Sequence, residues 1–225
     1  MSRPTGQWGR RSLAATGVVV AACGLLAACG GSSTPTTTTT VPPTTTTTAL
    51  TPAQQSQLQP KLLTVADFPS GWKLDTAPNA VSTTGAPKCV GNLVLAKGSP
   101  YRASAAFVGP SSNLAAAIQT VAPFPSGTTA KAAKSLKAGF LACNGATLQL
   151  GGGQSAKLAT GPVVIGPTGT GGFAAEMIIS DGNQHEYLYV FMGIKGDLGT
   201  LLVWRSVDKS SALFAATAAK ALAKL

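Results

Sequence analysis

Few residues in this sequence are suited to acid–base or nucleophilic chemistry. His185 is the only histidine, and only seven residues are acidic. A serine-type triad would join His185 to an exposed serine and a carboxylate, but no Gly-x-Ser-x-Gly motif occurs. Glu176, Asp181 and Glu186 could supply the two carboxylates of a glycosidase, yet with so few acids each is more simply a turn or strand-edge residue. The sequence therefore predicts no catalytic residues.

A glycine-rich segment offers a second candidate chemistry, phosphate binding. Residues 163–171 read Val-Val-Ile-Gly-Pro-Thr-Gly-Thr-Gly and begin like a phosphate-binding loop after a buried strand. Such a loop continues with Gly-Lys-Ser/Thr, whereas this chain continues with Gly172-Phe173. The next segment is also too short for the helix whose N-terminus would hold the anion. We interpret the segment as a connection between strands and expect no nucleotide and no cofactor.

Cysteine chemistry is indicated near the N-terminus. The run Leu26-Ala27-Ala28-Cys29 follows an apolar segment, Leu13–Ala22, and a basic region with Arg3, Arg10 and Arg11. The apolar segment is typical of a secretory signal, because it is too short and too diluted with Ala and Gly for a membrane span. Residues 26–29 resemble the lipobox of bacterial lipoproteins. That resemblance implies a signal peptide over 1–28, cleavage after Ala28, and diacylglycerol and palmitate on Cys29.

Two alternatives stay open for this export signal. Val20-Ala21-Ala22-Cys23 is a second match to the lipobox, but Cys29 is favoured because a flexible segment follows it directly. Arg10-Arg11 is compatible with twin-arginine export as well as with the general secretory route.

A threonine- and proline-rich segment separates the signal from the rest of the chain. Residues 34–48 are almost entirely Thr and Pro, so they offer nothing to fill a core, and we expect residues 29–50 to be a disordered tether. Residues 51–225 are the length of one domain. The expected arrangement is a single domain on the extracytoplasmic face of the membrane, in the periplasm or cell wall, anchored through Cys29.

The two remaining cysteines, Cys89 and Cys143, form an even pair in an exported chain. Such a pair predicts a disulfide. Closing a loop of about 55 residues contributes roughly 4 kcal/mol in the chain-entropy description. No metal site is expected, because the domain has a single histidine and no Cys-x-x-Cys.

The positive charge does not indicate nucleic-acid binding. The chain carries a formal charge of +10, and without Arg3, Arg10 and Arg11 it keeps 14 basic and 7 acidic residues. Most lysines are scattered, and only Lys131, Lys134 and Lys137 line up at helical spacing. A nucleic-acid interface would have denser arginines with aromatic residues between them, so a solvated helix face is the interpretation.

The residue pattern predicts an α+β fold, an antiparallel β-sheet with two main helices packed on one face. The helices are expected over Thr129–Cys143 and Ser210–Leu225, where apolar residues recur with helical periodicity. Alternation and turn residues predict the strands Tyr101–Val108, Ala146–Leu150, Ala156–Ile165, Phe173–Ile179, His185–Ile194 and Thr200–Arg205. A short helical lead-in is expected over Pro52–Val65, and Phe68 and Trp72 are expected to fill part of the core. Leu114–Val121 fits a helix or the second arm of a hairpin.

One strand carries aromatic residues on a single face. Tyr187, Tyr189 and Phe191 alternate with Leu188, Val190 and Met192, and Trp204 lies on the neighbouring strand. If the helices cover the aliphatic face, the aromatic face is either sealed by packing or open as a groove for an apolar or glycan ligand. Tyr187, Tyr189 and Trp204 are the candidate ligand residues, with Arg102 as a polar anchor.

The sequence resembles secreted lipoproteins of mycobacteria and related actinobacteria. The likeness rests on the threonine-rich tether before Leu62–Trp72 (LLTVADFPSGW), and on a helix ending at Phe140-Leu141-Ala142-Cys143 between two groups of strands. The same order is similar to the extracellular sensor domain of mycobacterial receptor serine/threonine kinases. The resemblance implies a non-enzymatic, sensor-like domain that binds an envelope ligand. The alternatives are a structural or protein-interaction module of the envelope and, least favoured, a wall-polymer hydrolase.

Overall fold

An antiparallel sheet dominates the computed structural model, which describes residues 50–76, 89, 101–110, 115–151, 154–182 and 184–225. Its eight strands lie in the order β1-β2-β3-β8-β7-β6-β5-β4. They are β1 (Lys73–Leu74), β2 (Ala103–Val108), β3 (Ala116–Pro123), β4 (Thr147–Gly151), β5 (Gln154–Pro162), β6 (Phe173–Asp181), β7 (Gln184–Lys195) and β8 (Leu198–Ser206). The helices are α1 (Pro52–Leu58), α3 (Thr129–Leu141) and α4 (Ser211–Ala223), with single-turn 3₁₀ helices η1 (Gln59–Lys61) and η2 (Val65–Asp67). The predicted combination of an antiparallel sheet with helices is confirmed, and β3 shows that the hairpin interpretation of 114–121 is the right one.

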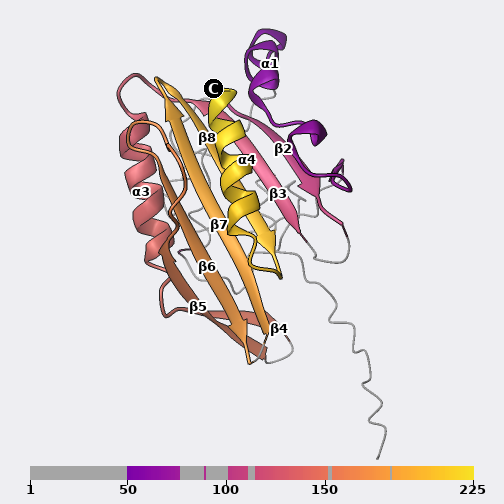
Figure 1. Cartoon of the computed structure of the whole chain (residues 1–225). Coiled ribbons are helices and arrows are strands. Elements are labelled where there is room, and N and C mark those ends of the chain that lie inside the picture. The colour runs from indigo at the N-terminus through magenta and orange to yellow at the C-terminus, as the bar shows by residue number, and fades with distance from the viewer. Residues whose placement is uncertain (1–49, 77–88, 90–100, 111–114, 152–153, 183) are drawn as a thin grey trace, which may run out of the picture.

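The two main helices lie on opposite faces of the sheet, so the expectation that they share one face is wrong. Helix α3 packs against Val190 and Met192 of β7. Helix α4 packs against Tyr189 and Phe191, the alternate residues of the same strand, and Figure 1 shows α4 lying across β7 and β8. The physical reason is that β7 is continuously apolar or aromatic from Tyr187 to Ile194, which is the pattern of a strand buried on both faces.

An N-terminal arm, residues 50–74, covers the part of the α4 face that lies over β2, β3 and β8. Phe68 and Trp72 are buried as the sequence predicts. The Trp72 ring lies 4.6 Å from that of Trp204, and the Phe68 ring lies 4.5 Å from that of Phe107. This aromatic cluster closes the core between the arm, the sheet and α4.

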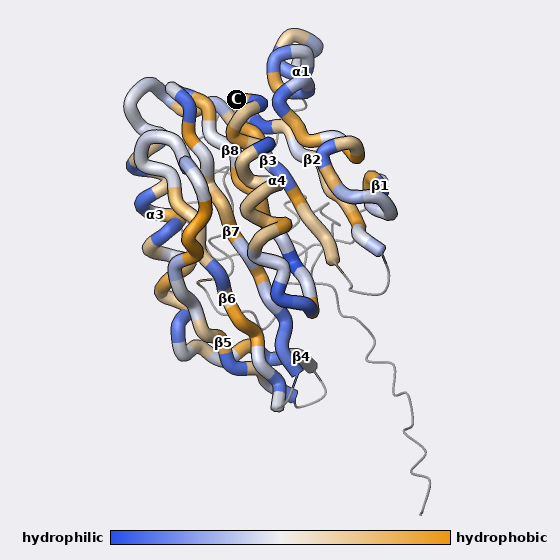
Figure 2. Tube along the Cα trace, in the orientation of Figure 1, coloured by the Kyte–Doolittle hydropathy of each residue, from blue (hydrophilic) through white to orange (hydrophobic). Residues whose placement is uncertain are grey.

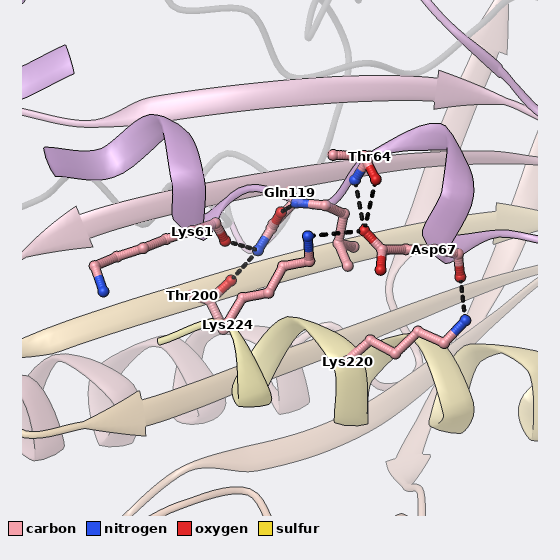
Figure 3. Close-up of polar contacts among 8 residues, drawn as sticks. Lys61, Thr64, Asp67, Gln119, Thr200, Lys220 and Lys224 are labelled. Carbon is pink, nitrogen blue, oxygen red and sulfur yellow. Dashed lines mark hydrogen bonds and ion pairs between the residues drawn. The ribbon is translucent and has the colours of Figure 1, made fainter. Parts of the chain in front are cut away.

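Polar contacts, buried at Gln119 and more exposed at Asp67, hold the arm in place, and Figure 3 shows them. The side chain of Gln119 on β3 accepts a hydrogen bond from the Leu63 backbone and donates to Thr200 Oγ1 at 3.0 Å and to the Lys61 carbonyl at 3.3 Å. Asp67 then joins the arm to α4, because Lys224 Nζ lies 3.0 Å from its carboxylate and Lys220 Nζ donates to its backbone carbonyl at 2.6 Å.

A disulfide joins Cys89 to Cys143, as the sequence predicts, with the two Cα atoms 5.4 Å apart. Cys143 follows α3 and is fully buried in the core on the α3 face, and Cys89 packs against that core. The expectations for the signal peptide, Cys23, Cys29 and the tether up to residue 49 lie outside the described residues.

Candidate functional site

Helix α4 leaves the outer ends of β5, β6 and β7 uncovered on its own face of the sheet. The register places nine residues there in three rows, which we call the β5–β7 platform. Its rows are Lys157–Ser180–His185, Ala159–Ile178–Tyr187 and Gly161–Glu176–Tyr189. Lys157, Ala159 and His185 are exposed, and Glu176, Ile178, Ser180 and Tyr187 are half-buried. Figure 1 shows these strand ends extending beyond the start of α4.

The platform has an apolar floor with a wall on one side. Ala159 and Gly161 are small, so β5 forms a low border, and Ile178 lies at the centre. Tyr187 forms the wall. Its ring lies nearly parallel to that of the buried Tyr189, 6.3 Å away, and the Tyr189 ring stacks 5.1 Å from Phe214 of α4. Figure 2 shows β6 changing from hydrophilic through hydrophobic to hydrophilic along this part of the sheet.

Glu176 and Tyr189 supply polar groups without partners at the inner row. Within the described chain, Glu176 makes no hydrogen bond or ion pair. The Tyr189 hydroxyl is buried and forms no hydrogen bond of regular geometry among the described residues, although the backbone N–H of Ser210 lies near it. Burial raises the pKa of this phenol, the neighbouring Glu176 carboxylate raises it further, and the backbone N–H of Ser210 partly offsets both. The phenol is therefore neutral at physiological pH and keeps its proton available for donation.

The outer row is polar and its groups are partnered. Ser180 Oγ lies 2.9 Å from Nδ1 of His185, the residue paired with it across β6 and β7. Lys157 Nζ donates to Thr147 Oγ1 at 2.9 Å. In the part of the chain that the structure describes, His185 has no carboxylate partner, and no group of three metal-ligating side chains occurs. The Ser–His pair thus lacks the third group of a triad.

The acidic residues do not assemble into a pair with Glu176. Strand alternation places Glu176 on the α4 face and both Asp181 and Glu186 on the opposite face. There Glu186 forms a two-point ion pair with Arg205. The two carboxylates that a glycosidase needs on either side of one bond are therefore not formed with Glu176.

The four residues predicted to bind a ligand do not converge. Tyr189 and Trp204 are fully buried, so this part of the aromatic face is sealed by α4 and the arm. Trp204 Nε1 donates to Ser210 Oγ at 3.1 Å, at the start of α4. Arg102 precedes β2, which β3 and β8 separate from β7. Of these four residues, only Tyr187 is accessible on the platform.

Sequence reasoning did not identify Lys157, Ile178 and Ser180 as members of one site. Residues 157, 178 and 187 are distant in the sequence, and only the strand register brings them into neighbouring rows. One feature of the sequence could have indicated this site: Glu176 is the single charged residue in the otherwise apolar run Phe173–Ile179.

The close packing of the chain requires glycines in the connection between β5 and β6. A Cβ atom at Gly172 would lie 2.2 Å from the Thr168 carbonyl oxygen, and one at Gly169 would lie 1.9 Å from that of Ile194. Glycine is required at both positions because the loop backbone passes directly against β7. Val163 and Ile165 pack toward the α4 face, and this loop therefore borders the platform.

Comparisons with known proteins identify a fold and no family. No protein-family model matches the sequence, and no curated protein matches it. A crystal structure of the extracellular domain of PknH from Mycobacterium tuberculosis is similar, with a TM-score of 0.56 and 14% sequence identity. The match covers 76% of this chain and 95% of that one. This likeness shows that the chain shares the fold of that extracellular domain.

Among the described residues, no helix is both long and apolar enough to cross a membrane.

Proposed function

We propose that this protein is a lipid-anchored, extracytoplasmic lipoprotein whose α+β domain is a non-enzymatic, sensor-like binding module. The observation that carries the proposal is the β5–β7 platform, an uncovered and chemically mixed surface on a fold shared with a receptor extracellular domain. Binding sites typically combine an apolar surface with a few polar groups that fix orientation, and the platform has this composition.

The proposal of binding without catalysis follows from the polar groups themselves. Ser180 and His185 hydrogen-bond each other without a carboxylate among the described residues, and Asp181 and Glu186 lie on the face opposite to that of Glu176. General acid–base chemistry needs a proton donor and acceptor directed at one reacting centre. The platform offers separated polar groups, which suit recognition.

The anchor is proposed from the sequence. Cys29 within Leu-Ala-Ala-Cys would carry the acyl chains, and the tether would lead to the arm at Leu50. The arm is joined to the sheet by Gln119 and to α4 by Asp67. The domain would therefore be held at the membrane through a firmly packed segment.

Native mass spectrometry of the exported chain, purified gently from an actinobacterial host, tests the binding function. The expected result is a population heavier than the chain by a defined mass, which Ala159→Arg removes by filling the platform. A control, Ala138→Arg on the exposed side of α3 and so on the opposite face of the sheet, should retain the added mass. A chain that carries no added mass and gains none from envelope extracts would contradict the proposal.

A second candidate, a protein-interaction module, is favoured by the other edge of the sheet. Strand β1 is an edge strand of two residues, and Leu74 on it is 53% exposed. Edge strands present unpaired backbone groups that a partner strand can join. In-cell crosslinking from a photoreactive residue at Leu74 would recover an envelope protein if this candidate is correct, and a blank result would count against it.

A further inference from the structure

The dimensions of the platform limit what it can bind. Two row intervals along the strands span about 13 Å, and the three strands span about 10 Å across. The side chains of Ala159 and Ile178 form the centre of the platform, and the side chain of Tyr187 lies beside them in the same row. A small cyclic molecule fits this area, whereas a folded protein surface would need a much larger one.

The apolar centre is bordered by hydrogen-bonding groups on two opposite sides. Glu176 offers carboxylate oxygens without partners at the inner row. Ser180 and His185 offer a hydroxyl and a ring nitrogen at the outer row, and Lys157 offers an ammonium beside them. A ligand suited to this pattern has an apolar face and a polar circumference with both donors and acceptors.

Charge and composition disfavour the main competitors. A phosphate or carboxylate ligand that spans the platform would be attracted by Lys157 at the outer row but would meet the Glu176 anion at the inner row, which would repel it. An acyl chain would lie against Glu176, Lys157 and His185 and would desolvate them without compensation. A hydroxylated ring instead donates to the carboxylate, accepts from Lys157, and places its C–H face on the ring of Tyr187.

We infer that the β5–β7 platform binds a neutral carbohydrate, with Tyr187 as the stacking residue and Glu176 as the main hydroxyl acceptor. This inference rests on the proposed binding function and specifies its ligand class. Tyr189 is paired with Glu176 across β6 and β7, and its buried hydroxyl makes no hydrogen bond to that carboxylate, which leaves the carboxylate oxygens for a ligand.

Saturation-transfer NMR with short neutral oligosaccharides of glucose, mannose, galactose, arabinose and N-acetylglucosamine tests the inference on the full exported chain. Decanoate and inorganic phosphate serve as the apolar and anionic probes. At least one oligosaccharide is expected to bind, and hydrogen exchange should show protection in 154–162, 173–182 and 184–190.

Variants locate the binding and separate it from folding. Tyr187→Ala should weaken affinity about tenfold, equivalent to about 1.4 kcal/mol, whereas Tyr187→Phe keeps the ring and should bind. Glu176→Gln should weaken binding, and Glu186→Gln, on the opposite face of the sheet, should not. Ala159→Arg is an exposed substitution that blocks the floor without touching the core, so it tests the site even if Tyr187→Ala unfolds.

The outcomes separate the inference from the proposed function. Oligosaccharide binding that Ala159→Arg abolishes supports both. Binding of decanoate, phosphate or a protein in place of the sugars, or sugar binding that Ala159→Arg leaves intact, overturns the carbohydrate inference and leaves a binding module. A chain that binds none of the probes and carries no molecule in native mass spectra overturns both.

Discussion

Replacing Gln119 by Leu should release the N-terminal arm from the sheet. Gln119 is fully buried, and its side chain contacts Leu63, Lys61 and Thr200 through three hydrogen bonds. Leucine has a similar volume, so the substitution removes the hydrogen bonds and creates little cavity. The buried Leu63 N–H then has no acceptor, because Leu63 lies against the apolar core of the α4 face.

The expected cost follows from that unsatisfied donor. A buried polar group left without its partner costs about 1–3 kcal/mol, and the hydroxyl of Thr200 recovers part of the loss by reorienting. We expect a decrease of about 2 kcal/mol in the free energy of unfolding. For a domain of this size that is a decrease of roughly 4–8 °C in the midpoint of thermal unfolding.

Thermal unfolding and hydrogen exchange measure the two parts of this prediction. The midpoint should fall, and amides in residues 58–68 should exchange faster than amides in β6 and β7. Gln149→Leu is the matched control, because Gln149 is exposed on β4 and should change stability by less than about 0.5 kcal/mol. An unchanged midpoint together with unchanged exchange in the arm would refute the reasoning.

Three further substitutions test other parts of the fold. Replacing Cys143 by Ser opens a loop with a sequence separation of 54 and should cost about 4 kcal/mol in urea unfolding; a loss below about 1 kcal/mol would contradict this. Gly172→Ala should cost about 2 kcal/mol or more, since its Cβ would collide with two carbonyl oxygens. Gly166→Ala, whose Cβ would meet nothing within 4 Å, should be neutral, and equal effects at the two glycines would be the contrary result. Burial raises the pKa of Asp67, but hydrogen bonds from Thr64 and the lysine ion pair outweigh it, so the pKa is lowered. This carboxylate therefore stabilises the fold above about pH 4 and loses its effect as the pH falls through the folded-state pKa. Asp67→Asn should cost roughly 0.5–1 kcal/mol at pH 7 and little at pH 2, and a pH-independent difference would be inconsistent with the lowered pKa.

The sequence predicted the elements better than their arrangement. Periodicity located α4, alternation located β2 and β4 to β8, and the even cysteine pair located the disulfide between Cys89 and Cys143. The side on which each helix packs was mispredicted, because β7 is apolar on both faces and alternation alone does not say which face a helix covers.

The candidate site was largely beyond sequence reasoning. Tyr187 was identified from its alternation, but Tyr189 and Trp204 belong to the core. Their burial depends on α4 and on the arm, and the arm is remote from them in sequence. The rows of the platform depend on the register of three strands, and a shift by one residue would exchange Glu176 for Met177 on that face.

Incorporation of an alkyne-bearing palmitate tests the central claim, a binding domain held outside the cell by acyl chains on Cys29, most directly. The wild-type chain expressed in an actinobacterial host should be labelled and recovered with membranes, and Cys23→Ser should behave in the same way. Cys29→Ser should lose both the label and the membrane association. An unlabelled wild-type chain, or a Cys29→Ser chain that keeps its label, would contradict the account.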